Sequence, residues 1–139
     1  EVDQVMRPLG SCRVARSDVT IREAMVAAGR TGRRSGAVML VDSAGRLDGL
    51  FTDSDLARLL EARRDRTLDE PIASHMTARP ITVATRSWLQ EAIAVMSHRR
   101  ISELPVVDEE GRPLGLLDIT DIMALGEPVD QPATVAVRR

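Results

Sequence analysis

Residues 41–56 read VDSAGRLDGLFTDSDL, and residues 107–122 read VDEEGRPLGLLDITDI. Placed one above the other, these stretches share, in order, Val, Asp, Gly, Arg, Gly, Leu and a final Asp. A second match lies upstream, where Ile21, Glu23, Ala24 and Met25 align with Leu89, Glu91, Ala92 and Ile93. The upstream offset is two residues longer, which we attribute to two extra residues of the first copy in the glycine-bearing stretch 29–36. The chain therefore holds two copies of one unit.

Each copy begins with the pattern of a strand followed by an amphipathic helix. Short apolar stretches at 12–14 and 81–83 predict the strands. Apolar residues then recur at helical spacing over 21–28 and 89–96. The candidate N-caps of these helices are Asp18 or Thr20 in the first copy and Ser87 in the second.

Each copy ends with the pattern of two strands and a second helix. Valine-rich runs at 37–41 and 104–107 are too short for buried helices and favour strands. Glycine-bearing turns lead from them into strands at 47–52 and 114–117. The candidate N-caps of the helices that follow are Asp53 or Ser54 in the first copy and Asp118 or Thr120 in the second.

The sequence thus predicts an α+β fold, with two tandem β-α-β-β-α repeats packed with pseudo-twofold symmetry into one disc-like module. A single unit of this size is marginally stable, and a second copy supplies a shared core. We expect the first repeat, with an N-terminal linker segment, over residues 1–70 and the second over 71–125. Residues 126–139 have no apolar period and are expected to form a flexible tail.

The composition is that of a globular chain without a strongly charged partner: 43% of the residues are hydrophobic and 29% are charged. A formal charge of −2 gives no reason to expect nucleic acid or a membrane surface. One cysteine, Cys12, and two histidines offer neither a disulfide nor a metal-site spacing. No apolar run reaches the roughly 20 residues that cross a bilayer, so a cytoplasmic location is expected. The start at Glu1 rather than Met indicates a piece of a longer polypeptide.

Three further motifs carry a family resemblance. They are Pro-Val-Val-Asp at 105–108, Met-Thr ahead of Pro-Ile-Thr-Val at 76–83, and Gly-apolar-apolar-x-x-x-Asp at both 49–55 and 115–121. In these features the chain resembles a tandem cystathionine-β-synthase-type (CBS) domain pair, a regulatory module. More narrowly, GLFTDSDLARLLE at 49–61, followed by PIASHMTARPITV at 71–83, resembles the C-terminal half of D-arabinose 5-phosphate isomerases. That resemblance implies an N-terminal sugar-isomerase domain as partner and a homodimer formed through the module's helices.

The first cleft is predicted at the junction of strand 47–52 with its helix. A strand that runs into a helix exposes unpaired N–H groups and the positive end of the helix dipole, which suits a phosphate. The resemblance implies that the hydroxyl of Thr52 holds phosphate and that Asp55 holds a ribose. The alternative is that these residues are ordinary helix caps. The candidate ligand-binding residues of this cleft are Phe51, Thr52, Asp53 and Asp55.

The second cleft departs from the first, because Asp118 stands where Thr52 stands and a carboxylate repels a phosphate. Asp121 remains for a ribose, and the resemblance places Thr82 and Glu103 on strands that line a base pocket. The candidate residues of this cleft are Ile81, Thr82, Glu103, Asp118, Thr120 and Asp121. Arg100 precedes the strand at 104–107 and either reaches a phosphate or is simply solvated.

The sequence is therefore compatible with three functions. The first is a regulatory module that binds AMP, ADP, ATP or a CMP-activated sugar acid and needs no cofactor. The second is a structural module that sets oligomeric state with empty clefts, in which Trp88 belongs to the core or a dimer interface. An enzyme in its own right ranks last, since no nucleophile, paired-carboxylate or metal-ligand pattern is present. The sequence leaves the ligand, and whether it activates or inhibits, open.

Overall fold

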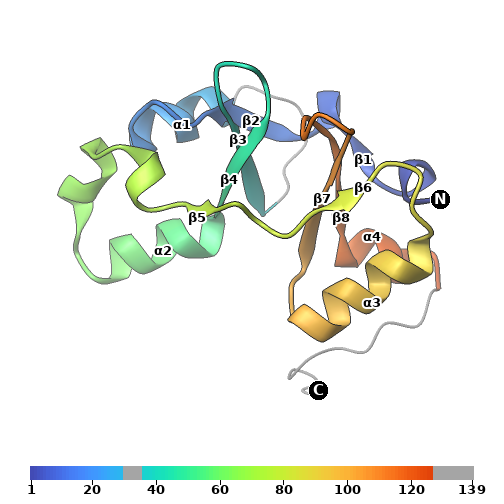
Figure 1. The fold of residues 1–139 in the computed structure, drawn as a ribbon. Coiled ribbons are helices and arrows are strands. Elements are labelled where there is room, and N and C mark those ends of the chain that lie inside the picture. Colours follow the sequence, from blue (N-terminus) through green and yellow to red (C-terminus); the bar gives the residue numbers. More distant parts are fainter. Residues whose placement is uncertain (30–35, 127–139) are drawn as a thin grey trace.

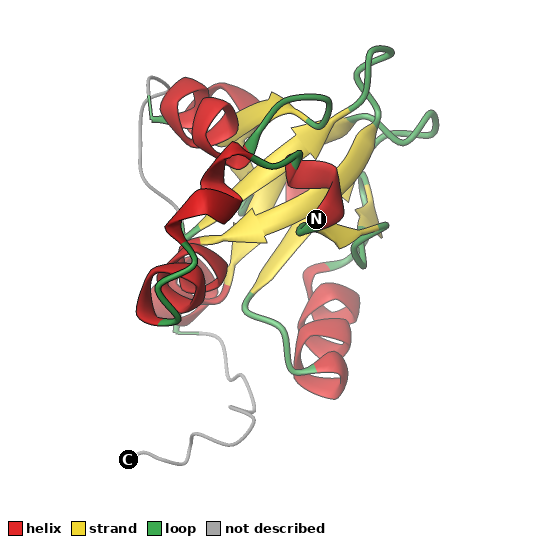
Figure 2. Ribbon diagram, turned by 90° about the vertical axis from the view of Figure 1, so that its left-hand side faces the viewer, coloured by secondary structure: helices red, strands yellow, loops and turns green. Residues whose placement is uncertain are grey.

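The computed structural model describes residues 1–29 and 36–126 and contains two sheets with helices at the periphery (Figures 1 and 2). The strands are β1 (Arg7–Pro8), β2 (Arg13–Arg16), β3 (Ala37–Val41), β4 (Leu47–Thr52), β5 (Thr77–Ala78), β6 (Val83–Ala84), β7 (Glu103–Val107) and β8 (Pro113–Asp118). The α-helices are α1 (Ile21–Ala28), α2 (Asp53–Glu61), α3 (Leu89–Arg99) and α4 (Ile119–Ala124). Short 3-10 turns span Val2–Gln4, Leu9–Ser11, Asp65–Asp69 and Ile72–Ser74.

The order of elements confirms the predicted α+β architecture. The first unit is β2-α1-β3-β4-α2, and the second is β6-α3-β7-β8-α4. In each, the first strand pairs in parallel with the second, which pairs antiparallel with the third. The proposed tail lies outside the described residues, except for Gly126.

The segment ahead of each unit joins the sheet of the other unit. β1 pairs antiparallel with β8, and β5 pairs antiparallel with β4, so the sheets run β1-β8-β7-β6 and β2-β3-β4-β5. Figure 1 shows the blue N-terminal segment beside the second unit. A Cβ atom at Gly115 would collide with the carbonyl oxygen of Arg7 and with Met6, which explains the glycine where β1 crosses β8.

Three apolar clusters of buried residues hold the two units together. The first-unit cluster includes Phe51 from β4 and Ile72 from the segment ahead of the second unit. The second-unit cluster includes Val2 from the N-terminal segment. A third cluster joins the sheets directly, because Met39 of β3 and Leu116 of β8 both belong to it. Neither unit therefore buries its core with its own strands and helices alone.

Two predicted helix caps differ from the observed ones. α2 is capped by Thr52 rather than by Asp53 or Ser54, because Thr52 and Asp55 satisfy each other's backbone N–H groups, at 3.0 and 2.9 Å. α3 is capped at Trp88 rather than Ser87, since the Glu91 carboxylate accepts the Trp88 N–H. Thr20 and Asp118 cap α1 and α4, in agreement with the sequence.

Trp88 lies on the surface of the second unit. Trp88 is 65% exposed, so it is not a core residue of this chain. In the part of the chain that the structure describes, no helix has the length and apolar character needed to span a bilayer.

Candidate ligand-binding cleft

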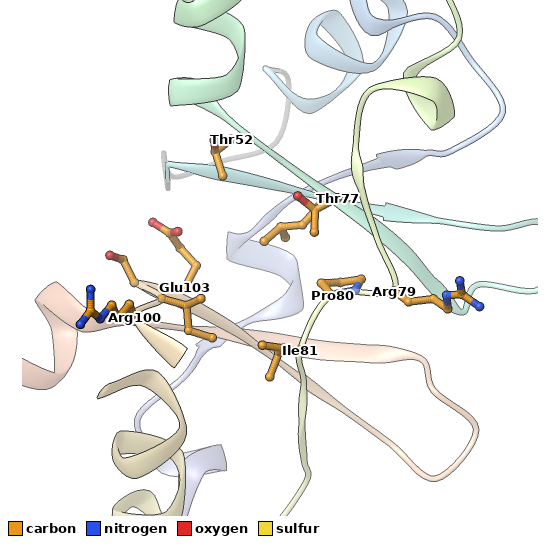
Figure 3. Close-up of a pocket in the computed structure, with 10 residues that line it drawn as sticks. Thr52, Thr77, Arg79, Pro80, Ile81, Arg100 and Glu103 are labelled. Atoms are coloured by element: carbon orange, nitrogen blue, oxygen red, sulfur yellow. The ribbon is translucent and has the colours of Figure 1, made fainter. Parts of the chain in front are cut away.

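A cavity of about 400 Å³ opens between the two units. It lies where the end of β4 faces the start of β7, and the linker through β5 passes along it (Figure 3). Both repeats therefore contribute to its wall. The lining residues are Leu50, Thr52, Thr77, Arg79, Pro80, Ile81, Arg100, Ile101, Ser102 and Glu103.

Thr52 brings a hydroxyl to this cleft at the N-terminus of α2. Its oxygen accepts the Asp55 N–H at 3.0 Å, and this bond leaves the hydroxyl hydrogen uncommitted. The Asp55 carboxylate accepts the Thr52 N–H and pairs with Arg58, so it completes the helix cap and does not line the cavity. Asp53 is exposed and accepts a hydrogen bond from Arg13 at 3.0 Å.

Glu103 brings a half-buried carboxylate to the same space. Figure 3 shows it pointing toward Thr52 across the cleft. Its backbone lies directly opposite Asp118 in the β7–β8 register, and Asp53 is also near. Burial raises the pKa of Glu103, and the negative charges of Asp118 and Asp53 raise it further.

Arg79 and Arg100 place cationic side chains at opposite ends of the cleft. In Figure 3 their guanidinium groups extend away from each other. Both residues have a left-handed backbone, with φ of 48° and 56°. The cleft therefore offers a hydroxyl and a carboxylate that face each other and an arginine at each end, an arrangement that suits a ligand with polar groups and an anionic end.

The raised pKa of Glu103 has a consequence for stability. A carboxyl whose folded pKa lies above its unfolded value destabilises the fold at pH above the folded pKa, and this penalty disappears as the pH falls to the unfolded value. We expect Glu103→Gln to raise the free energy of unfolding at pH 7 by no more than about 1 kcal/mol, since solvent screens the open cleft. The gain should shrink as the pH falls toward 4.5, the ordinary glutamic acid value.

Urea unfolding at pH 7 and pH 4.5 measures this effect, with Glu109→Gln in an exposed turn as the matched control. If the gain in the free energy of unfolding for Glu103→Gln instead grows toward low pH, the charged form of Glu103 does not destabilise the fold.

The remaining sequence candidates occupy different places. Ile81 lines the same cavity as Thr52, whereas Thr82 is exposed beside a separate hollow. Phe51 is 1% exposed and packs in the first-unit core. Thr120 is exposed at the start of α4, one residue before Asp121.

Asp118 and Asp121 are both engaged within the chain. Asp118 is buried and accepts hydrogen bonds from the N–H and hydroxyl of Thr120, at 2.9 and 2.7 Å. Asp121 accepts two hydrogen bonds from Arg7, from Nε at 2.7 Å and from Nη2 at 3.2 Å. The hydrogen bonds that Arg7 donates to Asp121 raise the pKa of Arg7, although burial lowers it, and the negative charge of Asp118 reinforces the rise.

Several lining residues were not anticipated from the sequence. They are Leu50, Thr77, Arg79, Pro80, Ile101 and Ser102. Thr77 has Arg7 as its counterpart in the other repeat, so the two repeats differ at this position. A closer comparison of the two copies would have singled out Thr77 by this difference.

Comparisons with known proteins agree with this architecture. Residues 72–127 match the family model of the CBS domain. A CBS domain protein from Pyrobaculum aerophilum, solved in complex with AMP, superposes with a TM-score of 0.71 at 26% identity and covers 86% of each chain. A CBS domain pair solved with 5′-methylthioadenosine and S-adenosyl-L-methionine has the same TM-score and identity and covers 91% of this chain and 98% of its own. The chain belongs to the CBS domain family and folds as a CBS domain pair.

Within that family, the chain is similar to the CBS region of arabinose 5-phosphate isomerases. It is 34% identical to the Pseudomonas aeruginosa enzyme KdsD over 99 residues, which make up 69% of this chain and 29% of that protein. The chain thus spans under a third of the length of these curated relatives.

Proposed function

We propose that this CBS pair is a ligand-sensing module that binds a nucleotide in the cleft between its units. The observation that carries the proposal is the cavity of about 400 Å³, to which both repeats contribute. Ligand pockets commonly have volumes of about 300–1,000 Å³. A ligand held there contacts β4 and β7 together, so its binding free energy depends on how the two units pack.

The chemistry of the wall favours a nucleotide over a purely apolar ligand. Arginine binds phosphate through several fixed N–H donors, and Arg79 and Arg100 stand at the two ends. The half-buried Glu103 accepts hydrogen bonds from a base amine or from ribose hydroxyls. AMP and S-adenosyl-L-methionine, with which structural relatives were solved, combine such donors with a charged group. A CMP-activated sugar acid has the same combination.

We further propose that the module regulates a sugar-phosphate isomerase domain, which carries the catalytic activity in the cytoplasm. Similarity to arabinose 5-phosphate isomerases supports this assignment. Among the described residues, no group of three or more His, Cys, Asp or Glu side chains is arranged to hold a metal ion. The role of the module is then to couple occupancy of the cleft to the activity of its neighbour.

A thermal-shift screen tests the ligand proposal with AMP, ADP, ATP, S-adenosyl-L-methionine, CMP and a CMP-activated sugar acid. A ligand that binds only the native state raises the melting temperature with concentration. A dose-dependent rise identifies the ligand class, and the absence of any rise contradicts ligand sensing.

Replacing Arg100 with asparagine is expected to weaken binding of the best ligand about tenfold, which corresponds to about 1.4 kcal/mol. Asparagine tolerates the left-handed backbone at this position, so the fold should be kept. Isothermal titration calorimetry measures the change. The matched control is Arg63→Asn, since Arg63 has the same φ of 56° but lies outside the cavity. Equal losses in both variants would exclude Arg100 from the site.

The second candidate function is oligomerisation through the helices, with empty clefts. Exposed apolar side chains favour it: Trp88 at the start of α3, Met123 on α4 and Leu125 just beyond. Sedimentation equilibrium on the ligand-free chain measures the oligomeric state and, together with the thermal-shift screen, distinguishes the two candidate functions. A stable dimer that binds no ligand supports this function over the first.

A further inference from the structure

The two units differ at a pair of positions that bear on the cleft. Arg7 on β1 and Thr77 on β5 occupy equivalent places, since each lies opposite the leucine that follows the second shared glycine of its partner repeat. Asp118 likewise stands where Thr52 stands. Two threonines that line the cavity on the first unit's sheet are thus replaced, on the second unit's sheet, by an arginine and an aspartate. The replacements carry opposite charges.

Arg7 is firmly bound where it lies. Its Nε and Nη2 donate hydrogen bonds to the two carboxylate oxygens of Asp121, at 2.7 and 3.2 Å, which is the forked geometry of strong arginine–carboxylate pairs. Its side chain is only 23% exposed. The equivalent aspartate of the first unit, Asp55, pairs with Arg58, whose side chain is 68% exposed on the same helix. A surface pair of that kind contributes little and opens easily.

We infer that Arg7 is a specificity-determining residue that closes the second unit's counterpart of the cavity to a nucleotide, because on that sheet its side chain takes the place of Thr77, binds Asp121 and offsets the charge of Asp118. This inference rests on the proposed function. It leaves the module with one nucleotide site per chain, the one at Thr52. A nucleotide in the second unit's counterpart would have to displace the side chain of Arg7 from Asp121, and its phosphate would face Asp118.

Converting the second cleft to the residues of the first tests the inference. Wild-type protein titrated with AMP by calorimetry is expected to bind one equivalent. The double variant Arg7→Thr/Asp118→Thr is expected to bind two, and threonine can still cap α4. The reciprocal variant Thr77→Arg is expected to weaken the single wild-type site at least tenfold. Two equivalents bound by the wild type, or one bound by the double variant, overturns the inference.

A second measurement does not depend on any nucleotide. Because an ion pair slows proton exchange, the Nε–H of Arg7 should give a distinct signal in a nitrogen-edited NMR spectrum, assigned by its loss in Arg7→Lys. We expect this signal to disappear in Asp121→Asn and to be unchanged by saturating AMP in the wild type. If no variant binds AMP, the proposed function fails, and this readout then tests the Arg7–Asp121 pair, the structural premise of the inference, on its own. A missing wild-type signal, a signal indifferent to Asp121→Asn, or one displaced by AMP overturns it.

Discussion

Replacing Phe51 with alanine is expected to lower the free energy of unfolding by about 3–5 kcal/mol, the usual loss for a buried phenylalanine. The side chain is 1% exposed and packs in the first-unit core with Val38 and Leu40 of the adjacent strand. Truncation removes this buried apolar surface and leaves a cavity that the rigid sheet fills only in part. Urea unfolding followed by circular dichroism measures the loss.

A second substitution at this position, Phe51→Leu, separates a structural role of Phe51 from a ligand-binding role. Phe51→Leu keeps most of the buried volume and should cost far less than Phe51→Ala. Nucleotide affinity of the folded Phe51→Leu protein should stay within about twofold of the wild type, a difference of about 0.4 kcal/mol. A stability change within about 0.5 kcal/mol for Phe51→Ala, accompanied by loss of nucleotide binding, would instead place the ring at the ligand.

Replacing Ile72 with alanine is expected to cost about 2–5 kcal/mol, although Ile72 belongs to the segment ahead of the second unit. Its side chain is fully buried in the core of the first unit. Because each unit holds a segment of the other, we expect both units to unfold together. Amide hydrogen exchange of β7, in the second unit, should therefore accelerate along with that of β3.

Leu60→Ala provides the control for this experiment, since Leu60 is apolar but 48% exposed on α2, and a change within about 0.5 kcal/mol is expected. Exchange that accelerates in β3 while β7 keeps its wild-type protection would show that the units unfold separately, contrary to the packing.

The repeat carried most of the information about the fold. Helical spacing over 21–28 coincides with α1, and the valine-rich run at 37–41 coincides with β3. The first strands were less well placed: the predicted 12–14 is observed as β2 at Arg13–Arg16, and 81–83 as the short β6 at Val83–Ala84. Strand ends depend on pairing partners, which a local apolar pattern does not contain.

The exchange of segments between units could not be read from the sequence. Val2 and Ile72 start matching segments, but a match between copies does not say whose core each one enters. The cleft was anticipated in part for a related reason. Thr52 was named from its strand–helix junction and Glu103 from the family resemblance, as a residue of the second cleft, and both line the same cavity. Arg79 reaches it through a left-handed turn in a linker, where no periodicity reveals the direction of a side chain.

Because β1 and β5 each join the sheet of the other unit, one repeat alone is not a complete folding unit. Half of the chain, cut at the sequence repeat, carries a leading segment that only a second half can bury, and it exposes a sheet edge that only such a segment can cover. A half-chain is therefore expected to be stable only when two half-chains associate. In this sense the tandem chain is a dimer whose two members have been joined end to end, so that their association no longer depends on concentration.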